Sequence, residues 1–163
     1  MKTQSGYEFY VALMIFITSV VFLFYEIVVY YPAFSVELKK EVLYSQAYKI
    51  SQLLINDPGE PRNWYLDISN AKRIGLQNES FQTLNVLSQV KAIALNSTCN
   101  QNYDTFKKLL GVNYNISIVF KLTNNSYVIN CTRVMYGENV AKISRIAAMD
   151  DGKSYGELII WVY

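Results

Sequence analysis

The chain contains no histidine in its 163 residues. Histidine is the most frequent general base, the usual partner of a serine or cysteine nucleophile and a common zinc ligand. The sequence also has no glycine-rich phosphate loop and no serine of the nucleophile-elbow type. The adjacent Asp150 and Asp151 precede Gly152 in a hairpin-turn pattern, so we interpret them as solvated turn residues. We therefore expect no enzyme activity, no metal and no cofactor.

Charge is sparse as well. The formal net charge is only +2, from 15 Lys and Arg against 13 Asp and Glu. The basic residues are scattered, whereas a surface that follows a phosphate backbone needs them clustered. The sequence therefore predicts no nucleic-acid partner.

Cysteine is nearly absent, with only Cys99 and Cys131 present. Their number and spacing match no metal-binding motif. A disulfide between them would close a loop of about 33 residues and stabilise the fold by roughly 3.5–4 kcal/mol in the chain-entropy account. Because disulfides persist in oxidising compartments, this pairing favours a location outside the cytoplasm. The alternative is two separate buried thiols.

What the sequence does have is one long apolar segment. The 17 residues from Phe9 to Tyr25 carry no charge, and apart from Glu26 the run continues to Tyr31. Seventeen helical residues extend about 25 Å, and the continuation gives enough length for a hydrocarbon core of roughly 30 Å. A cleaved secretory signal needs small residues after the apolar segment, but bulky residues follow here. We predict a retained transmembrane helix over residues 4–31.

The charge before the apolar run indicates the orientation. Lys2 is the only charged residue ahead of Glu8. Because positively charged flanks stay in the cytoplasm, we expect the N-terminus inside and everything beyond Tyr31 outside. The predicted location is a membrane anchor that carries an extracellular head.

The residues ahead of the apolar run form a recognisable order. They are Lys2, Thr3, Gln4, Ser5, Gly6, Tyr7 and Glu8. This order resembles the class III signal peptide of archaeal type IV pilin-like proteins, in which a basic leader precedes a Gln, a small residue two positions later, a Glu and a long apolar run. Gln4, Gly6 and Glu8 stand in that register. The resemblance covers the N-terminal third of the chain, and beyond it only the layout.

This resemblance implies that the prepilin peptidase removes a leader, residues 1–3, and leaves Gln4 as the first residue of the mature chain. Glu8 then becomes the fifth residue, where type IV pilins carry a glutamate. Thr3 stands where the family has Gly or Ala before the cut. A cut after Gly6 would satisfy the small-residue rule, but it would leave Glu8 at the second position.

Glu8 has a physical role in this interpretation. A carboxylate at the edge of a membrane span is costly unless a partner neutralises it. In pilins the resemblance implies that the partner is the new N-terminal amine of a neighbouring subunit, which also sets the axial register. The alternative is that Glu8 is only the polar edge of an ordinary signal anchor.

The function that the resemblance implies is structural. The chain would be a subunit of a type IV pilus-like surface filament or pseudopilus, with a head that makes adhesive or subunit contacts. Its partners would be the membrane, other pilin-like subunits, the prepilin peptidase and the assembly machinery. The alternative is a non-polymerising, single-span surface protein with a binding or adhesive head.

A second stretch, residues 32–56, continues the helix in amphipathic form. Pro32 predicts a kink, because proline removes one helical hydrogen bond. Apolar residues then recur at helical spacing, at Val36, Leu43, Ala47, Ile50 and Leu54. The helix is expected to stop at Asn56, where Pro58 and Gly59 follow.

The head, residues 57–163, has the pattern of an α+β domain. Gly59, Pro61 and Trp64 form a short stretch similar to one in archaeal pilin-like heads, and we interpret Trp64 as a core residue beside the first helix. Helical spacing predicts helices over residues 80–95 and 102–110, the second ended by Gly111. Alternation predicts strands over residues 114–122, 127–134, 141–149 and 154–163.

The last strand is apolar on both faces, which predicts a central place in the sheet or a strand covered on both faces. The expected fold class is therefore α+β: a long, kinked N-terminal hydrophobic helix packed on a small head with short helices and a mostly antiparallel C-terminal sheet. The resemblance to pilins implies the same arrangement.

Five Asn-X-Ser/Thr sequons occur, where the composition would give fewer than two by chance. Their asparagines are Asn78, Asn96, Asn115, Asn124 and Asn130. All five lie in the head, which fits N-glycosylation of a translocated domain. The alternative is a sequence that is simply rich in Asn. Asn115 and Asn130 fall on predicted strands and are the weakest candidates.

Overall fold

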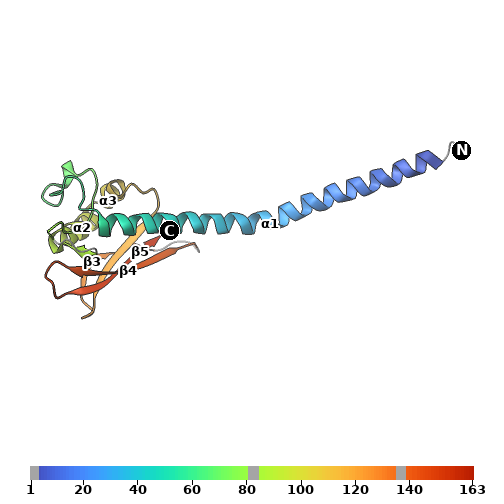
Figure 1. Ribbon diagram of the computed structural model, residues 1–163. Coiled ribbons are helices and arrows are strands. Elements are labelled where there is room, and N and C mark those ends of the chain that lie inside the picture. Colours follow the sequence, from blue (N-terminus) through green and yellow to red (C-terminus); the bar gives the residue numbers. More distant parts are fainter. Residues whose placement is uncertain (1–3, 81–84, 135–138) are drawn as a thin grey trace. The chain divides into compact units, whose positions relative to one another are not determined.

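The N-terminal helix α1 extends from Gln4 to Asn56 in the computed structural model, which describes residues 4–80, 85–134 and 139–163 (Figure 1). After residue 6 the helix contains no glycine, which apart from proline is the residue that disfavours a helix most. The helix continues through Pro32. The long apolar helix expected from the sequence is therefore present, with the expected end.

The chain divides into two compact units, residues 1–39 and residues 40–163. We call them the helical unit and the globular unit, and each is described by itself. In the helical unit the described structure is the first part of α1, and in the globular unit the rest of α1 is the first element.

A mixed five-stranded sheet forms the larger part of the globular unit, with the strand order β1-β4-β5-β2-β3. Its strands are β1 (Val86–Leu87), β2 (Ile116–Leu122), β3 (Tyr127–Cys131), β4 (Ala141–Met149) and β5 (Tyr155–Val162). β1 runs parallel to β4, and all other neighbours are antiparallel. β5 is the central strand, as its apolar character on both faces predicted.

The described part of the unit also contains the α-helices α2 (Gln89–Gln101) and α3 (Tyr103–Leu110) (Figure 1). A short 3-10 helix, η1 (Ile68–Asn70), lies between α1 and β1 in the sequence. The side chain of Asn102 caps the start of α3 by accepting a hydrogen bond from the Thr105 amide. Gly111 ends α3 in the left-handed conformation at φ 68°, as the sequence predicted.

One hydrophobic core joins α1 to the sheet. The buried residues that α1 contributes are Leu43, Ala47, Ile50, Leu54 and Ile55. They belong to the same cluster as the inner face of β2 and β5, which includes Ile118, Phe120 and Ile160, and as Leu95 of α2 and Phe106 of α3. The amphipathic pattern of residues 43–54 therefore identified the core face of this helix. Val36 does not belong to it, because it is exposed.

The helix predicted over residues 80–95 is wrong in its bounds. Residues 81–84 lie outside the described residues, Val86 and Leu87 form strand β1, and α2 begins only at Gln89. Pairing with β4 overrides the helical spacing here, since Leu87 is fully buried in strand conformation. The helix also runs further than predicted, to Gln101, and contains Cys99.

The second predicted strand is also shorter than expected. It was predicted to reach residue 134 but ends at Cys131 as β3. Part of the next connection, residues 135–138, lies outside the described residues. The turn predicted after Met149 is present, and β5 starts at Tyr155.

Trp64 is a core residue, as predicted. It is completely buried, and its Nε1–H donates a hydrogen bond to the Gly75 carbonyl at 3.0 Å. Gly59 adopts φ 88°, and a Cβ at that position would lie 2.3 Å from the indole ring. The glycine is therefore required both by the backbone conformation and by the close approach of the Trp64 ring.

Candidate functional site

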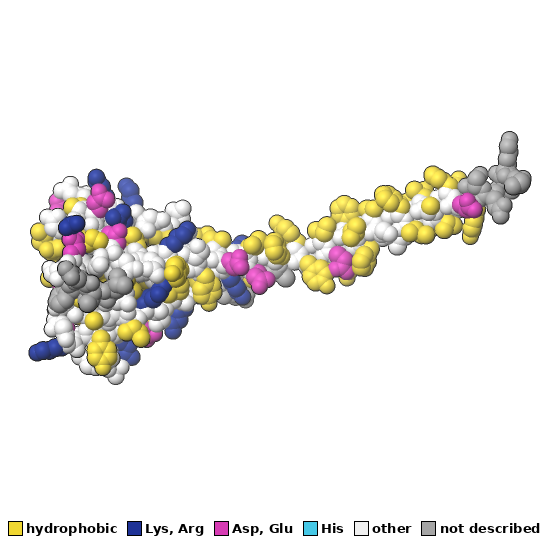
Figure 2. All heavy atoms as spheres, viewed as in Figure 1, with side chains coloured by type: hydrophobic (Ala, Val, Ile, Leu, Met, Phe, Trp, Pro, Cys, Tyr) yellow, Lys and Arg dark blue, Asp and Glu magenta, His cyan; other side chains and the backbone are white. Residues whose placement is uncertain are grey.

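The helical unit exposes an apolar surface around its whole circumference. Figure 2 shows hydrophobic side chains all along this part of the chain, and the consecutive residues Phe22, Leu23, Phe24 and Tyr25, which point to different sides of the helix, are each at least 59% exposed. The most apolar stretch of 18 residues has no buried residue, and within the described part of the chain α1 is the one helix long and apolar enough to cross a membrane. By length and composition this helix could anchor the chain.

Two carboxylates border the apolar stretch. Glu8 is exposed, and Glu26 is half-buried against its own helix. They are 18 residues apart, which is five turns of an α-helix, so both lie on the same side of α1 at a separation of about 27 Å. This separation is close to the roughly 30 Å thickness of a hydrocarbon core. Glu26 was noted in the sequence only as an interruption, although its spacing from Glu8 already defined this geometry.

The residues of the predicted cleavage pattern fall at the start of α1. Lys2 and Thr3 lie outside the described residues, and Gln4 is the first residue of the helix. Gly6 lies in the first turns, where an added Cβ would meet nothing within 4 Å. A small residue is therefore not required by packing at position 6 within this chain.

Cys99 and Cys131 form a disulfide that joins α2 to β3. Their Cα atoms are 5.9 Å apart, and both residues are completely buried. The Cys99 carbonyl also accepts a hydrogen bond from the Arg133 guanidinium at 3.1 Å. Among the described residues β3 is the edge strand of the sheet, so the disulfide and this bond hold α2 against that edge.

Two of the sequon asparagines lie side by side next to this disulfide. The Asn96 side-chain oxygen, on α2, accepts a hydrogen bond from the backbone amide of Asn130 on β3 at 2.9 Å. The Asn100 amide group also donates to Asn96. Asn96 therefore serves as an acceptor that satisfies an edge-strand amide. No sequence signal paired these two residues.

The other three sequon asparagines lie at turns and strand ends. Asn78 donates from its side-chain amide to Asp150 at 2.9 Å. Asn115 precedes β2, exchanges two backbone hydrogen bonds with Tyr163, and accepts one from Lys107. Asn124 is exposed in the turn between β2 and β3.

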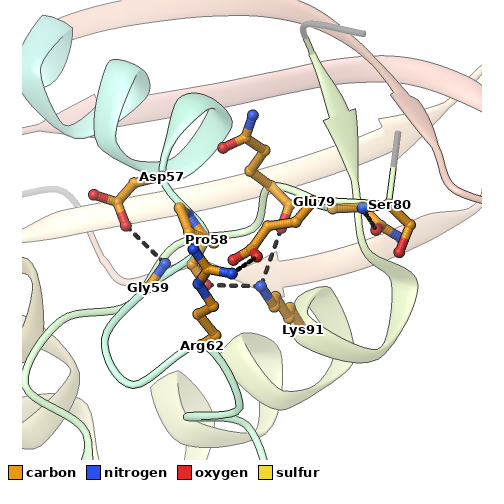
Figure 3. Close-up of polar contacts among 9 residues, drawn as sticks. Asp57, Pro58, Gly59, Arg62, Glu79, Ser80 and Lys91 are labelled. Atoms are coloured by element: carbon orange, nitrogen blue, oxygen red, sulfur yellow. Dashed lines mark hydrogen bonds and ion pairs between the residues drawn. The ribbon is translucent and has the colours of Figure 1, made fainter. Parts of the chain in front are cut away.

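A polar cluster lies where the chain leaves α1. We call it the Lys91 cluster; Figure 3 shows its members, which include Asp57, Pro58, Arg62, Glu79 and Lys91. The Lys91 amine, on α2, donates to the carbonyls of Pro58 at 2.7 Å and Gln77 at 3.0 Å. Arg62 forms an ion pair with Glu79 at 2.7 Å. The Lys91 amine thus ties two loop segments to α2 (Figure 3).

The surroundings of the Lys91 amine set its pKa and its role. Burial lowers the pKa of its amine below the ordinary value of 10.5, and the carboxylates of Glu79 and Asp57 oppose part of that effect. Both carbonyls accept hydrogen bonds from this amine, so the side chain acts as a cross-link between segments rather than as a free nucleophile. This role was not predicted, because helical spacing placed Lys91 on a helix but gave no partner.

Asp150 and Asp151, interpreted as solvated turn residues, differ from one another in the structure. Asp151 is exposed and accepts hydrogen bonds from the Ser154 hydroxyl and from the Ser154 and Lys153 amides, which lower the pKa of its carboxyl. Asp150 is half-buried and accepts hydrogen bonds from the Asn78 side chain and the Gln89 amide. Asp150 therefore caps the start of α2 from a distant turn, a role set only by the tertiary fold.

Within residues 4–80, 85–134 and 139–163, no group of three or more His, Cys, Asp or Glu side chains could hold a metal ion. Comparison with protein-family models, with curated proteins and with solved structures finds no match for this chain.

Proposed function

We propose that this chain is a membrane-anchored, extracytoplasmic subunit of the type IV pilin kind, whose helical unit packs against the helical units of neighbouring subunits. The observation that carries the proposal is a continuous helix with large apolar side chains exposed on every side. Such a surface requires lipid or other apolar helices around it. A filament core and a membrane both meet that requirement.

Glu8 supports assembly in addition to anchoring. At the membrane edge its carboxylate reaches water, but in a core of apolar helices it requires a cationic partner. A cut between Thr3 and Gln4 creates such a partner, because the new amine is positively charged and lies four residues from Glu8. The amine of one subunit would then neutralise Glu8 of its neighbour.

The globular unit supports a location outside the cytoplasm. Its two cysteines are paired in a buried disulfide, and disulfides persist in oxidising compartments. With Lys2 on the cytoplasmic side, the orientation expected from the sequence places this unit across the membrane. The same features fit a surface protein that never polymerises, so assembly needs a direct test.

The first test is the N-terminal sequence and the intact mass of the chain extracted from its native membranes. We expect a chain that begins at Gln4. A mature chain that retains Met1 or Lys2 would contradict processing by a prepilin peptidase. In that case the non-polymerising surface protein becomes the better account.

The second test measures assembly. Glu8→Ala should leave the chain in the membrane fraction but remove it from sheared surface filaments, whereas Glu37→Ala serves as the matched control because it deletes an exposed carboxylate beyond the apolar run of the same helix. If Glu8→Ala is recovered in filaments at the wild-type level, the charge-pairing role is wrong.

A further inference from the structure

We infer that Asn124 is the residue of the globular unit that is modified, and that it accepts an oligosaccharide on its side-chain nitrogen. This inference rests on the proposed extracytoplasmic location, because sugar transfer to an Asn-X-Ser/Thr sequon takes place on translocated segments. The sequence offers five such sites and sets only Asn115 and Asn130 lower, as residues of predicted strands. The structure separates Asn124 from the other four.

Asn124 occupies the most open backbone of the five. It lies in the turn between β2 and β3, closed by hydrogen bonds of Leu122 with Asn125 and Ser126. Asn125 adopts φ 66°, the left-handed conformation that tight turns use. All three residues from Asn124 to Ser126 are exposed, so a modifying enzyme can approach the whole sequon.

The side chains of this sequon are already arranged for the reaction. The Asn124 oxygen Oδ1 accepts hydrogen bonds from the Ser126 amide at 3.0 Å and from the Ser126 hydroxyl at 2.6 Å. These bonds occupy Oδ1 and orient the amide plane. Among the described residues no hydrogen bond engages Nδ2 of Asn124, so the nitrogen that must react is directed to solvent.

At Asn78 the corresponding nitrogen is occupied. Its Nδ2 donates to Asp150 at 2.9 Å, and Asp150 also caps α2 through the Gln89 amide. Modification of Asn78 would replace one of the two protons on Nδ2 and place a sugar beside the half-buried Asp150 carboxylate. In the folded chain Asn78 is therefore a structural residue.

At Asn96 and Asn115 the hydroxyl of the sequon is buried. Thr98 is 4% exposed and donates to the Ala94 carbonyl within α2, while Ser117 is completely buried and accepts from the Arg133 amide. An enzyme that reads the hydroxyl two residues after the asparagine cannot reach either group without unfolding the element that holds it.

Asn130 is constrained by its backbone. It pairs with Val119 in the sheet, its amide donates to Asn96, and the next residue is Cys131 of the disulfide. A strand that is held extended by β2 on one side and by Asn96 on the other cannot adopt the turn that Asn124 already has. Asn130 is therefore a poor acceptor of the oligosaccharide once the disulfide has formed.

The surface beside the turn suits a carbohydrate. A hollow of ≈ 540 Å³ is lined by Thr123 and Asn125, the two neighbours of Asn124, and by Ile146 and Tyr155. Ile146 is 76% exposed and Tyr155 is 57% exposed. The C–H face of a sugar ring packs on such apolar and aromatic side chains, so the first sugar on Asn124 would cover a surface that is otherwise exposed to water.

The chemical step is a group transfer. Nδ2 of Asn124 forms a bond with the anomeric carbon of the first sugar of a lipid-diphosphate-linked oligosaccharide. The bond from that carbon to the diphosphate oxygen breaks, and the lipid diphosphate leaves with the electron pair. One proton of Nδ2 passes to a base on the transferase. The product is an N-linked glycan with an unchanged side-chain carbonyl.

The test is glycopeptide mass spectrometry of the full chain extracted from its native membranes. We expect an oligosaccharide mass increment on the peptide that contains Asn124, and unmodified peptides for the other four sequons. Asn124→Gln and Ser126→Ala should each abolish the increment. Asn125→Gly is the matched control, because it keeps both sequon residues and favours the observed φ, so the increment should remain.

An unmodified Asn124 peptide, or an increment that persists in Asn124→Gln, would overturn the inference. The N-terminus of the same sample separates this outcome from the proposed function. A chain that begins at Gln4 and lacks the sugar overturns this inference alone, whereas a chain that retains Met1 and carries the sugar on Asn124 supports it and contradicts processing alone.

Discussion

The two units of this chain treat hydrophobic side chains in opposite ways, although a single helix supplies residues to both. In the helical unit, large side chains such as Phe16 and Tyr31 are exposed. In the globular unit the same helix buries Leu43, Ala47 and Leu54 against the sheet. The difference lies in what separates the apolar residues. Polar residues fill the intervening positions after residue 36, but almost none do so between residues 9 and 25.

This contrast shows that apolar content alone does not define a core. A helix with one apolar stripe buries that stripe within its own fold, whereas a helix that is apolar all round requires an environment that the chain does not contain. The stability of the globular unit should therefore depend on specific buried contacts. The helical unit should respond to lipid or to partner helices instead.

Trp64→Ala should give the largest loss of stability. The indole ring is completely buried and donates a hydrogen bond to Gly75, so we expect the free energy of unfolding to fall by about 3–5 kcal/mol. Denaturant unfolding of the full chain in detergent micelles, followed through the fluorescence of Trp161, measures this change. Phe16→Ala is the matched control and should change the value by less than about 0.5 kcal/mol. Equal losses would contradict the contrast between the units.

Removal of the disulfide should have the next largest effect. Cys99→Ser combined with Cys131→Ser releases a loop of about 33 residues and should lower the free energy of unfolding of the globular unit by about 3.5–4 kcal/mol. The helical content of the apolar segment in micelles should not change. Circular dichroism and denaturant titration measure the two effects separately, and reductant added to the wild-type chain should reproduce the loss. A change below about 1 kcal/mol would show that the connection of α2 to β3 does not depend on this bond.

Lys91→Met should have an intermediate effect. The carbonyls of Pro58 and Gln77 lose their donor, which should cost about 1–3 kcal/mol at neutral pH. Lys108→Met, at an exposed position of α3, is the control and should be nearly neutral. A loss no larger than that of the control would show that water satisfies the two carbonyls.

The same variant tests the pH dependence of stability. Burial lowers the pKa of the Lys91 amine in the folded chain, so the unfolded chain binds this proton more tightly. Stability should therefore rise with pH between the lowered pKa and the ordinary value of 10.5, and this rise should be absent from Lys91→Met. Unfolding curves from pH 7 to pH 10.5 compare the two proteins. A slope that is identical in both would assign the rise to other groups.

The smallest expected effect concerns Arg145, an inward-facing charge on β4. Its guanidinium lies 5.0 Å from the centroid of the Tyr48 ring on α1, and Arg145→Gln should lower stability by about 0.5–1 kcal/mol. Lys142→Gln, whose amine lies 5.9 Å from the Trp161 ring, is the comparison on the same strand and should cost less. Thermal unfolding in micelles resolves the difference if both variants are measured together. A larger loss for Lys142→Gln would show that the contact of Lys142 with Trp161 stabilises the fold more than that of Arg145 with Tyr48.

Much of the fold could be predicted because local patterns dominate it. The strand from residue 141 to 149 was predicted with its observed bounds, and Gly111 ends α3 as expected. The prediction of a helix over residues 80–95 failed at its start. Leu87 fits a helical spacing and a strand pairing equally well, and only its partner strand β4 decides between them. For the candidate site, the apolar segment and Glu8 were evident from composition and order alone.

What the sequence by itself determined is therefore the long apolar helix, the class of the globular unit and the set of candidate residues, since these depend on periodicity and on neighbours close in the chain. Only the tertiary structure decided that the Asn78 side chain donates a hydrogen bond to Asp150, that Ser117 is buried and that Asn124 is exposed. The physical reason is that a side chain's accessibility depends on partners far away in sequence, such as Asp150 for Asn78, and the spacing of residues carries no record of those contacts.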